Sequence, residues 1–127
     1  MEAVYIVIVL AVLQYFFFGT LVGYARGKYN VPAPATSGDP MFERYNRVHQ
    51  NTQESLLLFL PGIVLFSFYW SPGVAAALGV IWIIGRFIYL RAYVKAPESR
   101  GLGFGLTALP SLILLAGALI GAVRAML

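Results

Sequence analysis

The sequence predicts an all-α integral membrane protein whose single domain, residues 1–127, is a four-helix bundle. Three observations predict this fold: 60% of the residues are hydrophobic, only 11% are charged, and the charges are absent from long stretches. A soluble domain is about a quarter charged, so this chain has too few charges to cover a surface that faces water. The net charge of +4 comes from basic residues that flank apolar stretches, which is typical of membrane topology signals and not of nucleic-acid binding.

The first predicted helix covers residues 3–25, which carry no charge. At the helical rise this stretch is about 34 Å long, enough to cross a hydrocarbon core of about 30 Å. Residues 30–40 contain three prolines together with Thr, Ser, Gly and Asp, a composition that cannot continue a helix. They form the first predicted loop.

The second and third helices are predicted by the next charge-free run, residues 55–85, which Ser71, Pro72 and Gly73 interrupt. Its two parts are only about 24 Å and about 21 Å long as helices, so neither crosses the membrane alone. The second helix must therefore begin near residues 41–47, and the third must continue past residue 85 into polar sequence. Polar residues are thus drawn toward the membrane at one end of the bundle.

The fourth predicted helix covers residues 101–123, with a kink expected at Pro110, where a neighbouring helix can satisfy the freed carbonyl. Four spans place the first and third loops on one side, with eight basic residues, and leave only Arg124 on the other. The positive-inside rule then predicts that both loops face the cytoplasm and that both termini lie on the opposite side.

Polar side chains form two stripes at the loop side of this predicted bundle. The stripe on the second helix has offsets of three, seven and ten residues and consists of Arg44, Arg47, Asn51 and Glu54. The stripe on the third helix consists of Arg86, Tyr89 and Tyr93, and Arg100 follows beyond the helix end. Ionisable groups at membrane depth cost at least about 2.5 kcal/mol each, so these groups need partners or a cavity.

Two interpretations of the stripes remain open from the spacing alone. In the first, Glu54 pairs with Arg86 or Arg47 as a structural contact, and the other arginines reach lipid headgroups. In the second, the stripes form a pocket for a small zwitterionic or anionic ligand. The only histidine, His49, is more typical of a helix-surface hydrogen-bonding group than of a metal ligand, and no metal is expected. The chain has no cysteine, so any thiol must come from a substrate.

Two segments carry a resemblance to a known family. Residues 42–54, FERYNRVHQNTQE, and residues 85–93, GRFIYLRAY, followed by Ser99, Arg100 and Gly101, resemble the two signatures of the MAPEG family. This family comprises membrane-associated proteins of eicosanoid and glutathione metabolism, and the resemblance runs from about Gln14 to the C-terminus. It implies a four-helix protomer, a homotrimer, and a glutathione site between neighbouring protomers near the cytoplasmic face.

The resemblance also implies roles for individual residues. It places Arg100 at the position that activates the glutathione thiol. It places glutathione contacts at Arg26, Arg47, His49, Asn51, Glu54, Arg86, Tyr89 and Tyr93. The sequence departs from the family pattern at Ser55, where several members have tyrosine, and at His49, where some have glutamine. Gly27 replaces a second arginine seen in leukotriene-C synthases, which favours a general glutathione transferase or peroxidase.

The expected activity is attack by a glutathione thiolate on a lipophilic electrophile or a lipid hydroperoxide that enters from the membrane lipid. Arg100 would stabilise the thiolate, and glutathione would be a co-substrate. One alternative is a non-catalytic MAPEG-like protein that binds a lipid, which Arg100 at the activating position argues against. Another is a small four-helix transporter, which would need a carboxylate inside the first helix, where the sequence has only Gln14.

Overall fold

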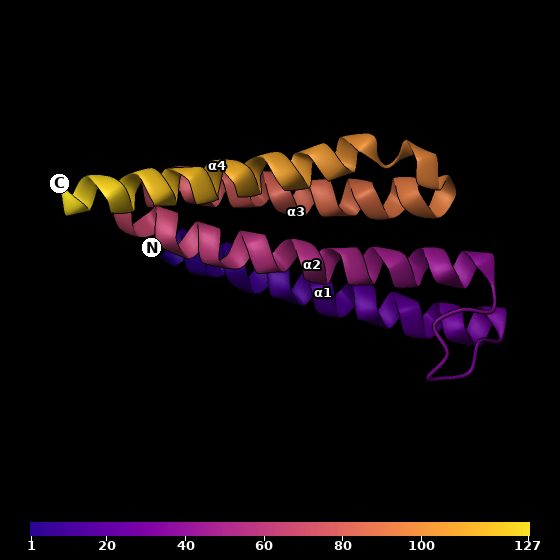
Figure 1. Ribbon diagram of the computed structural model, residues 1–127. Helices are drawn as coiled ribbons and strands as arrows, with labels where there is room; N and C mark the ends of the chain where they lie inside the picture. The colour runs from indigo at the N-terminus through magenta and orange to yellow at the C-terminus, as the bar shows by residue number, and fades with distance from the viewer.

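The computed structural model describes all of residues 1–127 and consists of four long helices (Figure 1). They are α1 (Glu2–Tyr29), α2 (Pro40–Tyr69), α3 (Pro72–Lys95) and α4 (Gly101–Met126), with a short 3-10 helix, η1 (Pro97–Ser99), before α4. All four long helices have the length and apolar composition needed to cross a membrane. The predicted all-α four-helix bundle is confirmed, and α2 and α3 extend into polar sequence as the length argument requires.

Side-chain caps fix where the two middle helices begin. At the start of α2, Asp39 Oδ1 accepts hydrogen bonds from the backbone N–H groups of Met41 at 2.9 Å and Phe42 at 3.1 Å. At the start of α3, Ser71 Oγ accepts one from the N–H of Val74 at 3.2 Å. A proline follows each cap, at a position where its missing N–H costs nothing. The predicted break between the second and third helices is therefore a defined helix start.

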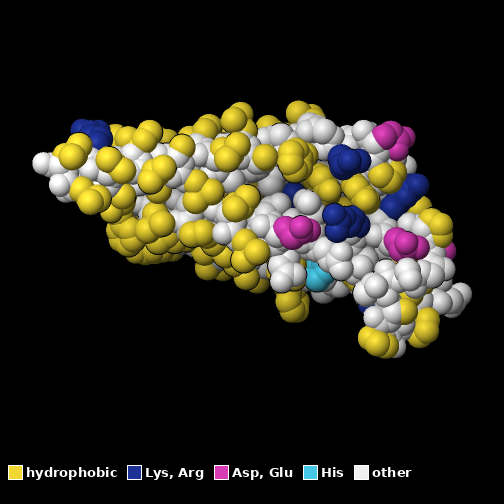
Figure 2. Space-filling view, in the orientation of Figure 1, with side chains coloured by type: hydrophobic (Ala, Val, Ile, Leu, Met, Phe, Trp, Pro, Cys, Tyr) yellow, Lys and Arg dark blue, Asp and Glu magenta, His cyan; other side chains and the backbone are white.

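The two ends of the bundle differ in what they contain (Figure 1). We call the end with residues 30–39 and 96–100 the loop end. We call the other end, with both chain termini and the turn at residues 70–71, the terminal end. In the space-filling view, charged side chains gather over the loop end, while hydrophobic side chains cover most of the remaining length (Figure 2).

The interior of the bundle is filled by aromatic and aliphatic side chains. Trp82 of α3 is fully buried and stacks on Phe59 of α2 with ring centroids 4.5 Å apart. Large apolar side chains also point outward along the helices, and Phe16, Leu57 and Phe68 each expose 70% or more of their surface. An apolar outer surface of this kind is stable in lipid and not in water.

Pro110 lies inside α4, which continues through it without interruption. A proline at this position leaves the carbonyl of Leu106, four residues earlier, without its helical donor. That carbonyl lies against α3, because a methyl group added at Gly85 would be only 3.1 Å from it. The neighbouring helix α3 therefore packs against this carbonyl.

Candidate functional site

Arg86 is buried at the centre of the polar region, between α2, α3 and α4. Its Nη2 donates to Thr52 Oγ1 at 2.9 Å, and its Nη1 lies 3.4 Å from both Ser55 Oγ and Thr107 Oγ1. The guanidinium also lies over the ring of Tyr89, 4.3 Å from the centroid. Arg86 is fully buried. Three hydroxyl oxygens and one aromatic face therefore replace water around this cation.

The three hydroxyl groups are oriented to accept from Arg86. Each donates its own proton to a carbonyl four residues earlier in its helix, at 2.8 Å. Their oxygens are thus left as acceptors for the guanidinium. No carboxylate takes part, and the one ion pair within the chain joins the N-terminus to Glu2 at the terminal end. The pairing of Glu54 with Arg86 or Arg47, expected by the structural interpretation, is not formed within the chain.

Tyr89 and Tyr93 connect Arg86 to the surface of the loop end. Tyr89 is buried and stacks on the half-buried Tyr93, with ring centroids 5.6 Å apart. An open pocket of about 290 Å³ beside Tyr93 has a mainly polar lining, formed by Thr36, Glu43, Arg44, Asn46, Arg47, Gln50 and Tyr93. The structure thus brings predicted site residues of α2, α3 and the α3–α4 connection into one region.

Several predicted site residues have no oppositely charged partner inside the chain or have a polar atom left without a hydrogen bond. Arg47 and Glu54 are exposed on α2 and make no ion pair. Asn51 is half-buried, and its Oδ1 is buried without a hydrogen-bond donor. Arg100 is exposed, donates to the carbonyl of Pro97 at 2.9 Å, and lines a second open pocket of about 560 Å³ next to Phe104. These groups are available to a ligand or to another chain.

Arg26 and His49 lie on the α1 side of the chain. Arg26 Nη1 donates to the carbonyl of Ala35 at 2.6 Å, and its guanidinium lies 4.8 Å from the ring centroid of Phe42. The imidazole of His49 stacks on Tyr15 of α1 with centroids 4.4 Å apart. These two residues therefore contact α1, the loop after it and the start of α2, and neither lines the pocket beside Tyr93 or the pocket beside Phe104. No group of three or more His, Cys, Asp or Glu side chains is placed to hold a metal ion.

The structure also assigns contacts that the two predicted stripes did not contain. Arg44 Nη1 donates to the carbonyls of Val94 at 2.9 Å and Lys95 at 3.3 Å, so it satisfies the end of α3. Thr52 and Thr107 were not predicted as partners of Arg86. The available signal was their type, because hydroxyl side chains often form hydrogen bonds between membrane helices. Ser55, which departs from the family pattern, supplies a third oxygen.

Comparison with known proteins shows the family to which this chain belongs. The sequence model of the MAPEG family matches residues 4–120. The chain belongs to the MAPEG family. Human microsomal glutathione S-transferase 2 is 37% identical over 112 residues, which cover 87% of this chain and 76% of that protein. Bovine leukotriene C4 synthase is 32% identical over 94 residues, covering 74% of this chain and 63% of that protein.

Another relative is an uncharacterized protein of Synechocystis. It is 48% identical over 111 residues, which cover 87% of this chain and 81% of that protein. The resemblance noted from residues 42–54 and 85–101 is therefore confirmed over most of the chain.

Proposed function

We propose that this MAPEG-family protein is a membrane-bound glutathione transferase that attacks lipophilic electrophiles with a glutathione thiolate. The observation that carries the proposal is the unpaired charge of Arg47, Glu54 and Arg100 at the loop end. The names of two of the relatives, a glutathione S-transferase and a leukotriene C4 synthase, support the same class of chemistry.

The polar groups of the loop end match the groups of glutathione, which has two carboxylates, one ammonium, two amides and a thiol. Arginines bind carboxylates through paired N–H donors, so Arg47 suits one carboxylate. Glu54 suits the ammonium, and the unpartnered Oδ1 of Asn51 suits an amide N–H. Tyr93 offers a hydroxyl beside Arg47 in the same pocket. Arg86, whose Nε also lacks a partner, fixes Tyr89 beneath them.

The proposed chemistry requires an ionised thiol. A free thiol has a pKa of about 8.5, so only a few per cent is thiolate at neutral pH. The Arg100 guanidinium remains charged and would lower the thiol pKa, at about 1.4 kcal/mol per unit. The thiol proton leaves to solvent, the sulfur forms a bond to the electrophilic carbon, and the leaving group departs with the bonding electrons. Lipid hydroperoxides are a second proposed substrate: the thiolate attacks the terminal oxygen, the O–O bond breaks, the lipid alcohol leaves, and the glutathione sulfenic acid formed reacts with a second glutathione to give glutathione disulfide and water.

We also propose that the glutathione site is completed between copies of a homotrimer, each copy a single domain of residues 1–127. The exposed face with Arg47 and Glu54 supports this, because charges on a membrane helix are stable only when they face a partner or a cavity. Arg26 and His49 lie on the α1 side of the chain and would reach the site from the neighbouring copy.

The orientation proposed for the chain places the loop end and the glutathione site in the cytoplasm and both termini on the opposite side. Eight basic residues at the loop end against Arg124 at the terminal end support it. A reporter fused after Leu127 should be active only outside the cytoplasm. A cytoplasmic reporter signal would reverse the topology and remove the site from the glutathione pool.

A conjugation assay with glutathione and a generic aryl halide, in detergent, tests the proposed activity. The purified protein should form the conjugate faster than the buffer does. If the guanidinium lowers the thiol pKa by about two units, Arg100→Ala should lose about 25-fold in rate at pH 7, because the thiolate fraction falls from about three quarters to about 3%. Arg124→Ala, which removes a basic residue at the terminal end, is the control and should keep full activity. Glutathione binding without turnover would instead indicate the non-catalytic lipid-binding alternative, and absence of both would favour the transporter.

A further inference from the structure

A third concave site lies between α1, α2 and α3 at the loop end, and neither Arg100 nor Glu54 lines it. It has a volume of about 560 Å³. Its lining comes from three helices and consists of Leu21, Met41, Arg44, Tyr45, Leu90, Arg91, Val94 and Lys95. We call it the α1–α3 crevice. Nothing in the proposed transferase chemistry uses it.

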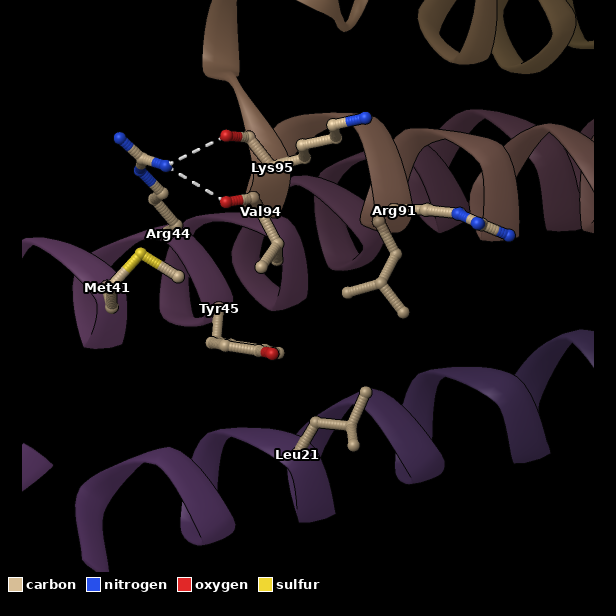
Figure 3. A pocket seen from close by; sticks show the side chains of 8 residues that line it. Leu21, Met41, Arg44, Tyr45, Arg91, Val94 and Lys95 are labelled. Atoms are coloured by element: carbon tan, nitrogen blue, oxygen red, sulfur yellow. Dashed lines mark hydrogen bonds between the residues drawn. The ribbon is translucent and has the colours of Figure 1, made fainter. Parts of the chain in front are cut away.

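The crevice is apolar inside and basic at its rim (Figure 3). The side chains of Leu21, Tyr45 and Val94 point into the space between α1 and α3, while those of Arg44 and Lys95 point away from it (Figure 3). Arg91 and Lys95 are exposed. An amphiphile fits this arrangement, because its chain needs apolar walls and its anionic headgroup needs cations at the opening.

No acidic side chain of the protein forms an ion pair with the three basic residues at the rim of the crevice, which are Arg44, Arg91 and Lys95. The only ion pair is at the terminal end, and no carboxylate lines the crevice. Arg44 is held in place by its hydrogen bonds to the carbonyls of Val94 and Lys95, so its position does not depend on a ligand. The crevice therefore presents a fixed positive charge next to an apolar cavity.

The charge balance of the whole loop end identifies the kind of occupant. Eight Lys and Arg residues lie at this end, against four carboxylates, those of Asp39, Glu43, Glu54 and Glu98. A second copy of the chain brings the same excess of positive charge and cannot neutralise it. Anionic membrane lipids can, because their headgroups carry a net negative charge at the depth where a basic membrane protein meets water.

We propose that the α1–α3 crevice binds one anionic phospholipid, with an acyl chain beside Leu21, Tyr45 and Val94 and the phosphate at Arg91 and Lys95. Each basic side chain near an anionic lipid surface favours binding by about fivefold. Removing both exposed cations should therefore lower binding by about 25-fold. A zwitterionic lipid of the same chain length should bind less tightly to the parent protein.

Native mass spectrometry of the delipidated full-length protein tests the proposal, with equimolar dioleoyl phosphatidylglycerol and dioleoyl phosphatidylcholine as probes. The parent protein should retain phosphatidylglycerol preferentially. The double variant Arg91→Gln and Lys95→Gln should lose this preference. The control Lys28→Gln and Arg124→Gln removes the same charge elsewhere and should keep it. Equal retention of the two lipids by the parent, or the same loss in the control, would overturn the proposal.

A second variant separates the crevice from its charged rim. Val94→Trp fills the cavity and leaves all three cations, so it should also lose phosphatidylglycerol. If Val94→Trp keeps the lipid but changes the oligomeric state, another copy of the chain fills the crevice and the proposal is wrong. Oleate added at the same concentration should not displace the phospholipid, and complete displacement would mean that the site takes free fatty acids instead.

Discussion

Glycines bring helices close together at both ends of the bundle, but only the loop end adds a buried cation that is held by hydrogen bonds. At the terminal end, α4 meets α2 through glycines, and a methyl group added at Gly117 or Gly121 would lie 2.6 Å from Phe66 or 2.5 Å from Tyr69. At the loop end, the hydrogen bonds of Arg86 to hydroxyl groups tie α3 to α2 and α4. Close apolar contact needs no polar partner, whereas the buried cation requires several.

The ends also differ in how many polar groups are left unpaired. At the terminal end, Arg124 lies over the ring of Trp70 at 5.3 Å, and Trp70 Nε1 donates to the carbonyl of Gly117 at 2.8 Å. At the loop end, Arg47 and Glu54 are exposed and unpaired. This difference indicates that the polar groups of the terminal end stabilise the transmembrane bundle, whereas charged groups of the loop end remain free to bind a ligand.

The largest expected effect is a loss of glutathione affinity when one of the unpaired charges at the loop end is removed. Arg47→Ala or Glu54→Ala should weaken glutathione binding by about 2 to 5 kcal/mol, the usual result of removing one partner from a desolvated charge pair. Isothermal titration of the purified protein with glutathione measures this loss. Arg124→Ala is the matched control at the terminal end and should bind like the parent. If both loop-end variants fold and bind glutathione normally, their charges are structural.

The second-largest expected effect is a loss of folding stability where α3 and α4 cross at the loop end. A methyl group at Gly103 would lie 2.5 Å from the backbone N of Tyr89, which cannot move aside as a side chain can. Gly103→Ala should therefore destabilise the protein by about 3 kcal/mol, at the upper end of overpacking costs. Gly105→Ala, which meets nothing within 4 Å, is the control and should be neutral or slightly stabilising. Thermal unfolding in detergent measures both, and equal melting temperatures would contradict the packing.

The smallest expected effect comes from the hydroxyl groups around Arg86. Thr52→Val keeps the shape but removes the acceptor at 2.9 Å, so it should cost about 1 to 3 kcal/mol by leaving a buried donor unpaired. Thr107→Val should cost less, because its contact is longer, at 3.4 Å. The same unfolding measurement ranks the two variants. A larger loss for Thr107→Val would mean that the hydrogen bond to Thr52 is not the main support of the cation.

The sequence predicted the spans well because their lengths follow from simple arithmetic. Residues 55–70 and 72–85 are too short to cross a membrane, so α2 had to begin in polar sequence and α3 had to continue through Arg86. The observed bounds of both helices confirm this. Helical periodicity also placed Arg86, Tyr89 and Tyr93 on one face of the third helix. In the structure these three side chains are linked by direct contacts.

The sequence did not predict which face of α2 meets Arg86. Periodicity defines a stripe on one helix but not the rotation of that helix toward its neighbours. Thr52 and Ser55, which flank the stripe, face Arg86, while Glu54 turns outward. Arg44 belongs to the stripe by spacing, but its long side chain reaches the end of α3. These contacts depend on how the helices pack against one another, which cannot be read from a single sequence.

The ultraviolet thiolate band of bound glutathione tests most directly whether the loop end activates a thiol. Because the chain has no cysteine, a band that appears on adding glutathione at neutral pH comes from the ligand alone. The parent protein should show this band, Arg100→Ala should lose it while still binding glutathione, and Arg100→Lys should recover part of it because a positive charge remains. A band that persists unchanged in Arg100→Ala would contradict the account and assign the role to another group, with the Tyr93 hydroxyl the first to test.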